Sequence, residues 1–160
     1  MSLSLTSPAF SHQGDIPDAH TCDGANTSPA LRWSGVPSNA KSLVLIVDDP
    51  DAPDPKAPTH THVHWVLYDI ATSTTELASG QSPSPKGARE GLNSWKKRGY
   101  GGPCPPVGKH RYFFKLYALD STLGDLAAPT KDSLEQAMRG HVLDQAELVG
   151  TYERVTATKA

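Results

Sequence analysis

The sequence predicts a mainly β protein, a β-sandwich or an open barrel with few helices. There are 13 glycines and 14 prolines among 160 residues, and such frequent turn-forming residues favour short strands over long helices. Several segments have the length and composition of strands, and one segment has the periodicity of a helix. The length fits a single domain, residues 1–160, with enough chain to bury a hydrophobic core.

Leu43–Val47 is the strongest strand candidate. It is a continuous apolar run rich in branched residues, which is typical of a strand buried on both faces. Leu31–Trp33 reads as a short edge strand that Gly35 and Pro37 close. Three further strands are predicted: Val63–Ile70, His110–Leu119 and Glu147–Val155.

One helix is predicted near residue 134. Leu134, Ala137 and Met138 form an apolar stripe, Thr130 or Asp132 can cap its start, and the glycine at position 140 or a residue just beyond can end it. Two stretches rich in Pro, Gly, Ser and Lys are predicted to be surface loops: Asp51–Thr61 and Ser79–Ser94.

Charge and targeting signals exclude several classes of protein. Fifteen basic and 17 acidic residues give a formal charge of −2, so there is no basic surface of the kind that nucleic acid requires. No run approaches the roughly 20 apolar residues of a membrane span, and Met1–Phe10 lacks the pattern of a signal peptide. We therefore expect a cytoplasmic protein without integral membrane association.

Cys22 and Cys104 are the two cysteines. They form no C-x-x-C pair, which excludes a structural zinc knuckle. Reduced thiols are the default expectation for a cytosolic protein, and a single bridge between these two cysteines is the minority alternative.

Three carboxylates follow the most apolar strand, at Asp48, Asp49 and Asp51. Presented together at the end of a strand they repel one another, so a cation, hydrogen-bond donors or solvent must balance their charge. Pro50 and Pro53 stiffen this segment. The alternative is an ordinary solvated turn.

His60, His62 and His64 alternate along the next predicted strand, so their side chains point to one face. Imidazoles with a nearby carboxylate suit zinc, copper or iron. At this spacing at most two of the three can share one ion. A metal-dependent enzyme built on His62, His64 and Asp49 is therefore the least favoured alternative.

A glycine- and proline-rich segment, residues 99–106, precedes the strand that begins at His110. Glycines free backbone N–H groups to converge on an anion. His110 and Tyr112 share a face of the strand and can donate to phosphate oxygens. One alternative is a rigid connection without a ligand. Another is a nucleophile site in which Cys104 is the thiol, His110 the base and Asp49 the orienting group.

These motifs together resemble the phosphatidylethanolamine-binding protein family. The motifs are D-P-D-A-P after an apolar strand, then H-W-V-L-Y, then G-P-C-P-P-V-G-K-H-R-Y-F-F-K-L-Y-A-L-D. The opening T-C-D-G-A-N-T-S-P-A-L-R-W-S-G-V-P and the closing G-H-V-L-D-Q-A-E-L-V-G-T-Y resemble its bacterial and archaeal branch, often labelled Raf-kinase-inhibitor-like. The resemblance runs from Ser7 to about Glu153.

The resemblance implies an antiparallel β-sandwich with one or two short helices and a small pocket at one end. That pocket accepts phosphate, phosphorylethanolamine or a similar anion, without a cofactor, a bound metal or catalytic turnover. Carried over residue by residue, the ligand-binding positions are Asp49, Asp51, His64, Gly102, Cys104, Pro105, Pro106, His110 and Tyr112.

The sequence also departs from the family pattern. His62 stands where a bulky aromatic residue is common, and only residues 107–109 separate Pro106 from His110. The chain stops soon after the last predicted strand, so we expect no C-terminal helix over the pocket and a more open site. A regulator that docks on a kinase or a protease is the alternative function, and a homodimer is expected by analogy.

Overall fold

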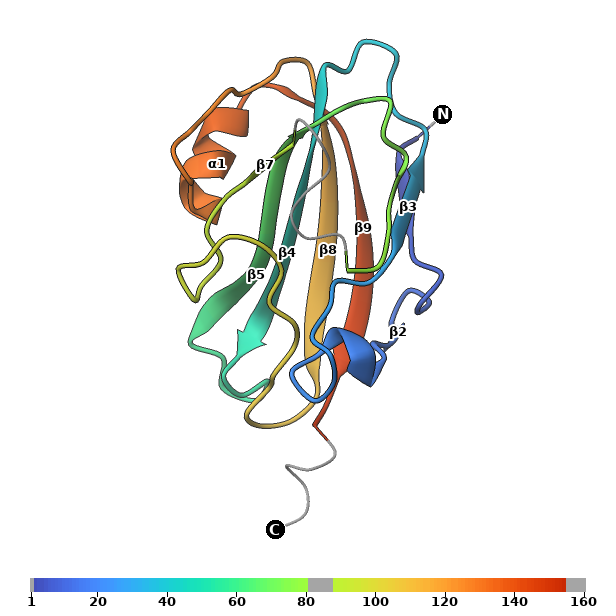
Figure 1. The fold of residues 1–160 in the computed structure, drawn as a ribbon. Helices are drawn as coiled ribbons and strands as arrows, with labels where there is room; N and C mark the ends of the chain where they lie inside the picture. The colour runs from blue at the N-terminus through green and yellow to red at the C-terminus, as the bar shows by residue number, and fades with distance from the viewer. Residues whose placement is uncertain (1, 81–87, 155–160) are drawn as a thin grey trace.

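The computed structural model describes residues 2–80 and 88–154, which form two β-sheets packed face to face (Figure 1). The smaller sheet has the strand order β1 (Ser4–Thr6), β3 (Leu31–Ser34) and β6 (Glu76–Leu77). The larger sheet has the order β2 (Gly14–Asp15), β9 (Val142–Tyr152), β8 (His110–Leu119), β4 (Ser42–Ala52), β5 (His60–Ile70) and β7 (Arg89–Glu90). A short 3-10 helix, η1 (Asp18–His20), and one α-helix, α1 (Lys131–Met138), complete the described residues. The predicted mainly β sandwich with one or two short helices is confirmed.

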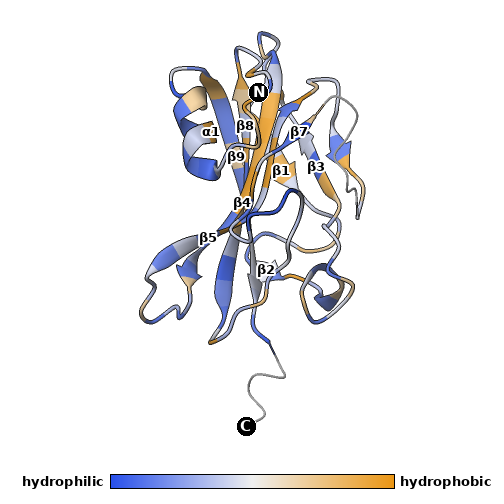
Figure 2. Ribbon diagram, turned by 60° about the vertical axis from the view of Figure 1, so that its left-hand side comes forward, coloured by the Kyte–Doolittle hydropathy of each residue, from blue (hydrophilic) through white to orange (hydrophobic). Residues whose placement is uncertain are grey.

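Strand β4 lies inside the larger sheet and is buried on both faces, as its composition predicts. Leu43, Leu45 and Val47 belong to the core between the two sheets. Val44 and Ile46 alternate with them and pack in a second core under α1. Fully burying each such side chain contributes roughly 1.5–3 kcal/mol. Figure 2 shows this strand as a continuous hydrophobic band through the molecule.

Helix α1 covers the outer face of the larger sheet. The Thr130 hydroxyl accepts a hydrogen bond from the Ser133 N–H at 3.3 Å, which caps the helix start. Leu134 and Met138 are buried against the sheet, and Gly140 follows with a positive φ of 83°. The predicted helix, its cap and its apolar stripe are confirmed. None of the helices in the described ranges is long and apolar enough to span a membrane.

Two expectations about individual strands need correction, and one pairing departs from the antiparallel arrangement that the resemblance implies. Leu31–Trp33 does not form an edge strand, because β3 lies between β1 and β6. Strand β4 does not end at Val47 but continues to Ala52, so the predicted loop from Asp51 begins inside a strand. Strand β2 pairs in parallel with β9, whereas every other pairing in the larger sheet is antiparallel.

Other predicted boundaries shift by a few residues. Strand β5 begins at His60, which shortens the preceding loop, and β8 spans the predicted His110–Leu119. Strand β9 starts at Val142, before the predicted Glu147, and Val155 lies outside the described residues. Part of the predicted loop Ser79–Ser94, residues 81–87, also lies outside them, and β7 occupies two of its remaining residues. The expectation that no helix follows β9 concerns residues outside the described range.

Candidate functional site

A pocket of about 320 Å³ lies at one end of the sandwich, where β4 ends and where β5 and β8 begin. It is lined by Asp49, Ala52, Pro53, His60, His62, His64, Trp95, Cys104, Pro105, Pro106, His110 and Tyr112. We call it the first pocket. Seven of the nine sequence-predicted ligand residues line it, and the two that do not are Asp51 and Gly102.

A β-bulge in β5 directs the histidines into this pocket. Val47 of β4 pairs with Trp65, but the next residue, Asp48, pairs with Val63, so His64 is an extra residue on β5. Trp65 packs in the core between the sheets while Val63 packs on the outer core. The bulge therefore lets both His64 and Trp65 face inward. The His62 and His64 rings lie 4.8 Å apart between centroids, which confirms that the histidines share a face.

Three buried polar atoms of the first pocket have no hydrogen-bond partner among the described residues: His62 Nε2, His64 Nε2 and the Tyr112 hydroxyl. Burial, helped by the neighbouring His62, lowers the pKa of His64 to about 3, so His64 is neutral near pH 7. Its Nδ1 lies 2.7 Å from the carbonyl oxygen of Gly101, an acceptor, so Nδ1 carries the proton. The unprotonated Nε2 is thus the free ring atom.

The other two unpartnered atoms differ in character from His64 Nε2. Burial raises the pKa of Tyr112, so its hydroxyl stays protonated and can donate a hydrogen bond. Burial lowers the pKa of His62, while the charge of Asp49 raises it. At neutral pH the pocket therefore offers the Tyr112 hydroxyl as a donor and His64 Nε2 as an acceptor, while His62 Nε2 can serve as either.

His110 and Asp49 form a buried pair at the base of the pocket. Nδ1 of His110 lies 2.5 Å from Oδ2 of Asp49, and both side chains are less than 5% exposed. Nε2 of His110 faces two carbonyl oxygens, of Val107 at 2.8 Å and Pro53 at 3.0 Å. Because those oxygens only accept, Nε2 must carry a proton. His110 therefore has no N–H free for a ligand, although it shares the face of Tyr112 as predicted, with ring centroids 6.3 Å apart.

Burial raises the pKa of Asp49, and the hydrogen bonds from His110 and from the N–H of Asp51 oppose this rise. Asp49 Oδ1 accepts from that N–H at 2.7 Å, so both carboxylate oxygens are already engaged. With one proton between His110 and Asp49 and another on Nε2 of His110, the pair carries no net charge. The fixed carboxylate orients the imidazole and leaves the pocket neutral at its base.

The other two aspartates point away from the first pocket. Asp48 is ion-paired on the outer face with Lys115 at 3.2 Å and with Lys131 of α1 at 3.0 Å. Asp51 accepts from Nε and Nη2 of Arg111 at 2.9 and 2.8 Å, and these bonds lower the pKa of Asp51. The expectation that the carboxylates gather at one rim is wrong, as is the solvated-turn alternative. Each buried carboxylate has its own cationic or imidazole partner.

Neither Gly101 nor Gly102 presents a free N–H group to the pocket. The N–H of Gly101 donates to the carbonyl oxygen of His64 at 3.0 Å, and the N–H of Gly102 donates to Oδ1 of Asn26 at 2.8 Å. A side chain on Gly102 would approach the carbonyl oxygen of His20 to 2.3 Å. The two glycines thus allow close packing between loops, which corrects the predicted role of these N–H groups as anion donors.

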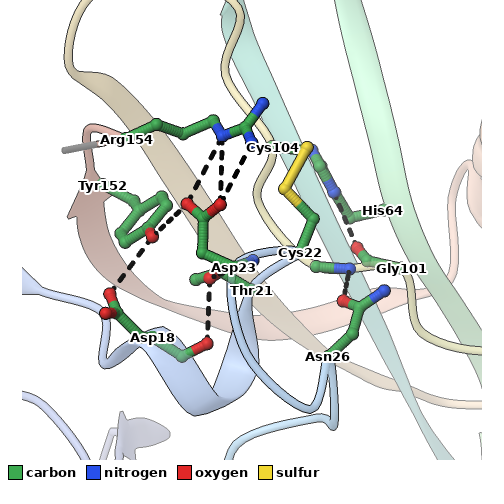
Figure 3. The surroundings of a disulfide bond; sticks show 11 residues. Asp18, Thr21, Cys22, Asp23, Asn26, His64, Gly101, Cys104, Tyr152 and Arg154 are labelled. Atoms are coloured by element: carbon green, nitrogen blue, oxygen red, sulfur yellow. Dashed lines mark hydrogen bonds and ion pairs between the residues drawn. A yellow bond between two sulfur atoms is a disulfide. The ribbon is translucent and has the colours of Figure 1, made fainter. Parts of the chain in front are cut away.

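Cys22 and Cys104 are joined by a disulfide, with their Cα atoms 5.4 Å apart (Figure 3). The default expectation of reduced thiols is therefore wrong in this structure. The physical reason is loop convergence: the N–H of Cys22 donates to the carbonyl oxygen of Pro103 at 3.0 Å, which aligns the two loops. Because Cys104 is bridged, it supplies no thiolate, and the nucleophile alternative loses its attacking group. Nearby, Asp23 accepts from Tyr152 and Arg154, tying the end of β9 to the same loop.

Trp95 is the pocket residue that sequence reasoning missed. Its ring meets His62 edge-on at 4.4 Å and His64 at 5.3 Å between centroids, yet the residue is 43% exposed. The available signal was a single tryptophan within a segment of lysines and arginine. Ala52 and Pro53 were also missed as lining residues, because β4 extends as far as Ala52, and His60 was considered only as a possible metal ligand.

The geometry does not favour the alternative of a metal-dependent enzyme built on His62, His64 and Asp49. Within residues 2–80 and 88–154, no group of three or more His, Cys, Asp and Glu side chains is arranged to hold an ion. His62 and His64 do approach each other, but the third proposed ligand, Asp49, is engaged with His110.

Comparison with known proteins gives concordant matches. A family model described as phosphatidylethanolamine-binding protein matches residues 6–153. A UPF0098 protein from Methanothermobacter thermautotrophicus is 46% identical over 155 residues, covering 95% of this chain and 99% of the relative. Among solved structures, a phosphatidylethanolamine-binding protein homologue from Chlamydia trachomatis is 45% identical with a TM-score of 0.89, covering 96% of this chain and 98% of that one. YbcL from E. coli, described as a member of the mammalian family, is 30% identical with a TM-score of 0.85, covering 96% and 99%.

Proposed function

Because the chain belongs to the phosphatidylethanolamine-binding protein family, we propose that its first pocket binds a small phosphorylated ligand without catalytic turnover. The ligand is phosphate or a phosphorylethanolamine-like group. The observation that carries this proposal is the set of unpartnered buried atoms, His62 Nε2, His64 Nε2 and the Tyr112 hydroxyl, which line one cavity. Buried polar groups are normally satisfied, so a cavity that gathers three such atoms suits a polar guest.

The donor and acceptor pattern suits a phosphate monoester that carries one proton. The Tyr112 hydroxyl donates to one phosphate oxygen, and the P–O–H of the ligand donates to Nε2 of His64. A dianion instead requires a proton on His64, which its burial opposes. Ala52, Pro53, Pro105 and Pro106 supply apolar walls that keep water from the phosphate.

The supporting role of the Asp49–His110 pair is structural. The two side chains bond to each other, His110 also bonds to two backbone carbonyls, and Asp49 accepts from the N–H of Asp51. Tyr112, whose ring stacks beside His110, is therefore held in place. In this proposal Asp49 and His110 position the donor and do not themselves donate. This role replaces the expectation that His110 donates to phosphate.

A calorimetric and NMR titration tests the proposal. Inorganic phosphate and O-phosphorylethanolamine are added to the wild-type protein and to Tyr112→Phe, with Tyr117→Phe as the matched control. Tyr117 lies on the same strand but packs on the outer face under α1. We expect saturable binding that Tyr112→Phe weakens about tenfold, the effect of losing one hydrogen bond to a charged group, while Tyr117→Phe leaves it unchanged.

Absence of saturable binding to both ligands at millimolar concentration contradicts the proposal. That result would favour the alternative of a regulator that docks on a kinase or a protease. The homodimer and the cytoplasmic location stay predictions, each open to direct measurement by ultracentrifugation and by cell fractionation.

A further inference from the structure

A second cavity of about 390 Å³ lies directly beside the first pocket. Both cavities have Trp95 and Cys104 in their walls. The second cavity differs in charge, because Lys97 and Arg98 line it and no acidic side chain does. Its remaining walls come from the two loops that the disulfide joins, whose approach Figure 3 shows.

The indole of Trp95 is the partition between the two cavities. On one side it meets the rings of His62 and His64 edge-on. Beneath it lies Gly101, where a Cβ atom would come within 2.2 Å of the indole carbon Cζ3. The ring therefore rests directly on the backbone, and it borders both cavities.

The turn that carries the two cations is held by Asn93. Oδ1 of Asn93 accepts from the N–H groups of Trp95 at 3.0 Å and Lys97 at 3.2 Å, and the N–H of Asn93 donates to the carbonyl oxygen of Lys97 at 2.9 Å. Leu92 pairs with Arg98 across the turn. The backbone positions of the tryptophan and both cations are thus fixed before any ligand arrives, which lowers the entropy lost on binding.

The two cations are available to an anion. Lys97 and Arg98 are exposed, and among the described residues neither makes an ion pair within 4 Å. Arg98 also borders a neighbouring cavity that Glu90 and Asp125 line, and there its charge opposes the rise that burial causes in the pKa of Glu90. A guanidinium and an ammonium that border one cavity suit a phosphate or a carboxylate.

We infer that the second cavity is an anion subsite of the same binding site, and that the ligand carries two anionic groups. A phosphate monoester occupies the first pocket, and a second phosphate or carboxylate, joined by a short chain, passes Trp95 to meet Lys97 and Arg98. This inference rests on the proposed function. The covalent link makes the second contact intramolecular, so two weak sites combine into a tighter one.

Alkanediol bisphosphates of about three to eight carbons, each compared with its own monophosphate, test the inference because the gain depends on linker length. We expect at least one bisphosphate to bind the wild-type protein about tenfold more tightly than its monophosphate. The double variant Lys97→Ala/Arg98→Ala should remove that gain and leave the monophosphate affinity within about twofold, since the first pocket is untouched. A charge-matched control, Arg32→Ala/Lys41→Ala, alters two exposed cations elsewhere and should keep the gain.

The outcomes separate this inference from the proposed function. If monophosphates bind and Tyr112→Phe weakens them, but no linker gives a gain or the gain survives Lys97→Ala/Arg98→Ala, the second subsite is refuted alone. If monophosphates do not bind, both proposals fail. Sedimentation with phosphatidylcholine vesicles, with and without phosphatidylinositol 4-phosphate, identifies whether the ligand is a lipid or a soluble compound. Pelleting that requires Lys97 and Arg98 assigns the ligand to a lipid headgroup. An affinity gain for bisphosphates in solution, without pelleting, assigns it to a soluble compound.

Discussion

His64 donates from Nδ1 to the carbonyl oxygen of Gly101 at 2.7 Å, and this single bond decides which atom the first pocket receives. Gly101 belongs to the loop against which the Trp95 ring packs. Loop and strand are joined twice, because the N–H of Gly101 donates back to the carbonyl oxygen of His64 at 3.0 Å. The ring is thus held in one tautomer, with an unprotonated Nε2 buried in the pocket.

This tautomer predicts how ligand affinity changes with pH. A phosphate monoester has its second pKa near about 6, so below that pH it brings the proton that Nε2 of His64 accepts. Above about pH 6 either the ligand or His64 must take up a proton, and affinity should fall by up to about tenfold per pH unit. Isothermal titration with O-phosphorylethanolamine between about pH 5 and 8 measures this slope.

Dimethyl phosphate provides the comparison, because a diester has no proton to bring. We expect it to bind more weakly than the monoester throughout the same range. An affinity for the monoester that does not change with pH, or equal affinities for the two compounds at low pH, would show that the proton is not shared with His64.

His64 also predicts acid sensitivity of the fold. Its pKa is about 3 in the folded protein, against 6.5 for an unperturbed histidine. The unfolded chain therefore binds more protons between these values, so the contribution of neutral His64 is complete above pH 6.5 and is lost as the pH falls toward 3. The loss is at most about 1.4 kcal/mol per pH unit.

Urea unfolding of the wild type and His64→Gln across this pH range measures the effect. We expect the free energy of unfolding to fall more steeply with decreasing pH in the wild type than in His64→Gln. Parallel slopes for wild type and His64→Gln would mean that His64 does not titrate differently on folding.

The sequence predicts the strands and the shared face of His110 and Tyr112, because both follow from the alternation of side chains along one strand. It does not predict the bulge at His64. The bulge depends on how β5 pairs with β4, and the residues of one strand alone do not reveal that pairing. The extension of β4 through Asp51 was hidden for a similar reason. Carboxylates normally mark a turn, and here partners on β8 and α1 neutralise them inside a strand.

The loops were the least predictable part of the site. Gly102 is fixed by Asn26, 76 residues away in the chain, and Cys104 by Cys22, 82 residues away. Composition alone indicates that a glycine-rich loop can approach something closely, but not whether that partner is an anion or another loop. Only the folded structure reveals that the partner of Gly102 is another loop of the protein and not an anion.

Two aspartates of β4, Asp49 and Asp51, should differ sharply in what they contribute to stability. Asp49→Ala leaves His110 buried without its partner, and removing one member of a buried pair costs about 3–5 kcal/mol. Asp51→Ala frees an Arg111 side chain that is 55% exposed, and water replaces the lost bonds, so we expect a loss of about 1 kcal/mol. Urea unfolding at neutral pH compares the two variants. Equal losses would contradict the view that the Asp49–His110 pair is closed to solvent.

The disulfide should stabilise the fold without shaping the first pocket. It closes a loop of 82 residues, and its removal by Cys22→Ala/Cys104→Ala should lower the free energy of unfolding by about 2–5 kcal/mol, because the unfolded chain gains freedom. The wall that carries Cys104 keeps other anchors, since Cys22 N–H still meets the Pro103 carbonyl and Gly102 N–H still meets Asn26. Phosphate affinity of the folded variant should therefore stay within about twofold of wild type.

Thermal unfolding and calorimetric titration of the double variant separate these two effects. Thr21→Ala provides a control in the same loop. It removes the bond from the Thr21 hydroxyl to the Asp18 carbonyl and the bond from the Asp23 N–H to that hydroxyl, and it leaves the bridge intact. A large loss of affinity in a fully folded Cys22→Ala/Cys104→Ala protein would show that the bridge itself sets the position of the pocket wall. An unchanged free energy of unfolding would mean that the two loops hold together in the unfolded chain as well, so that the bridge removes no freedom from it.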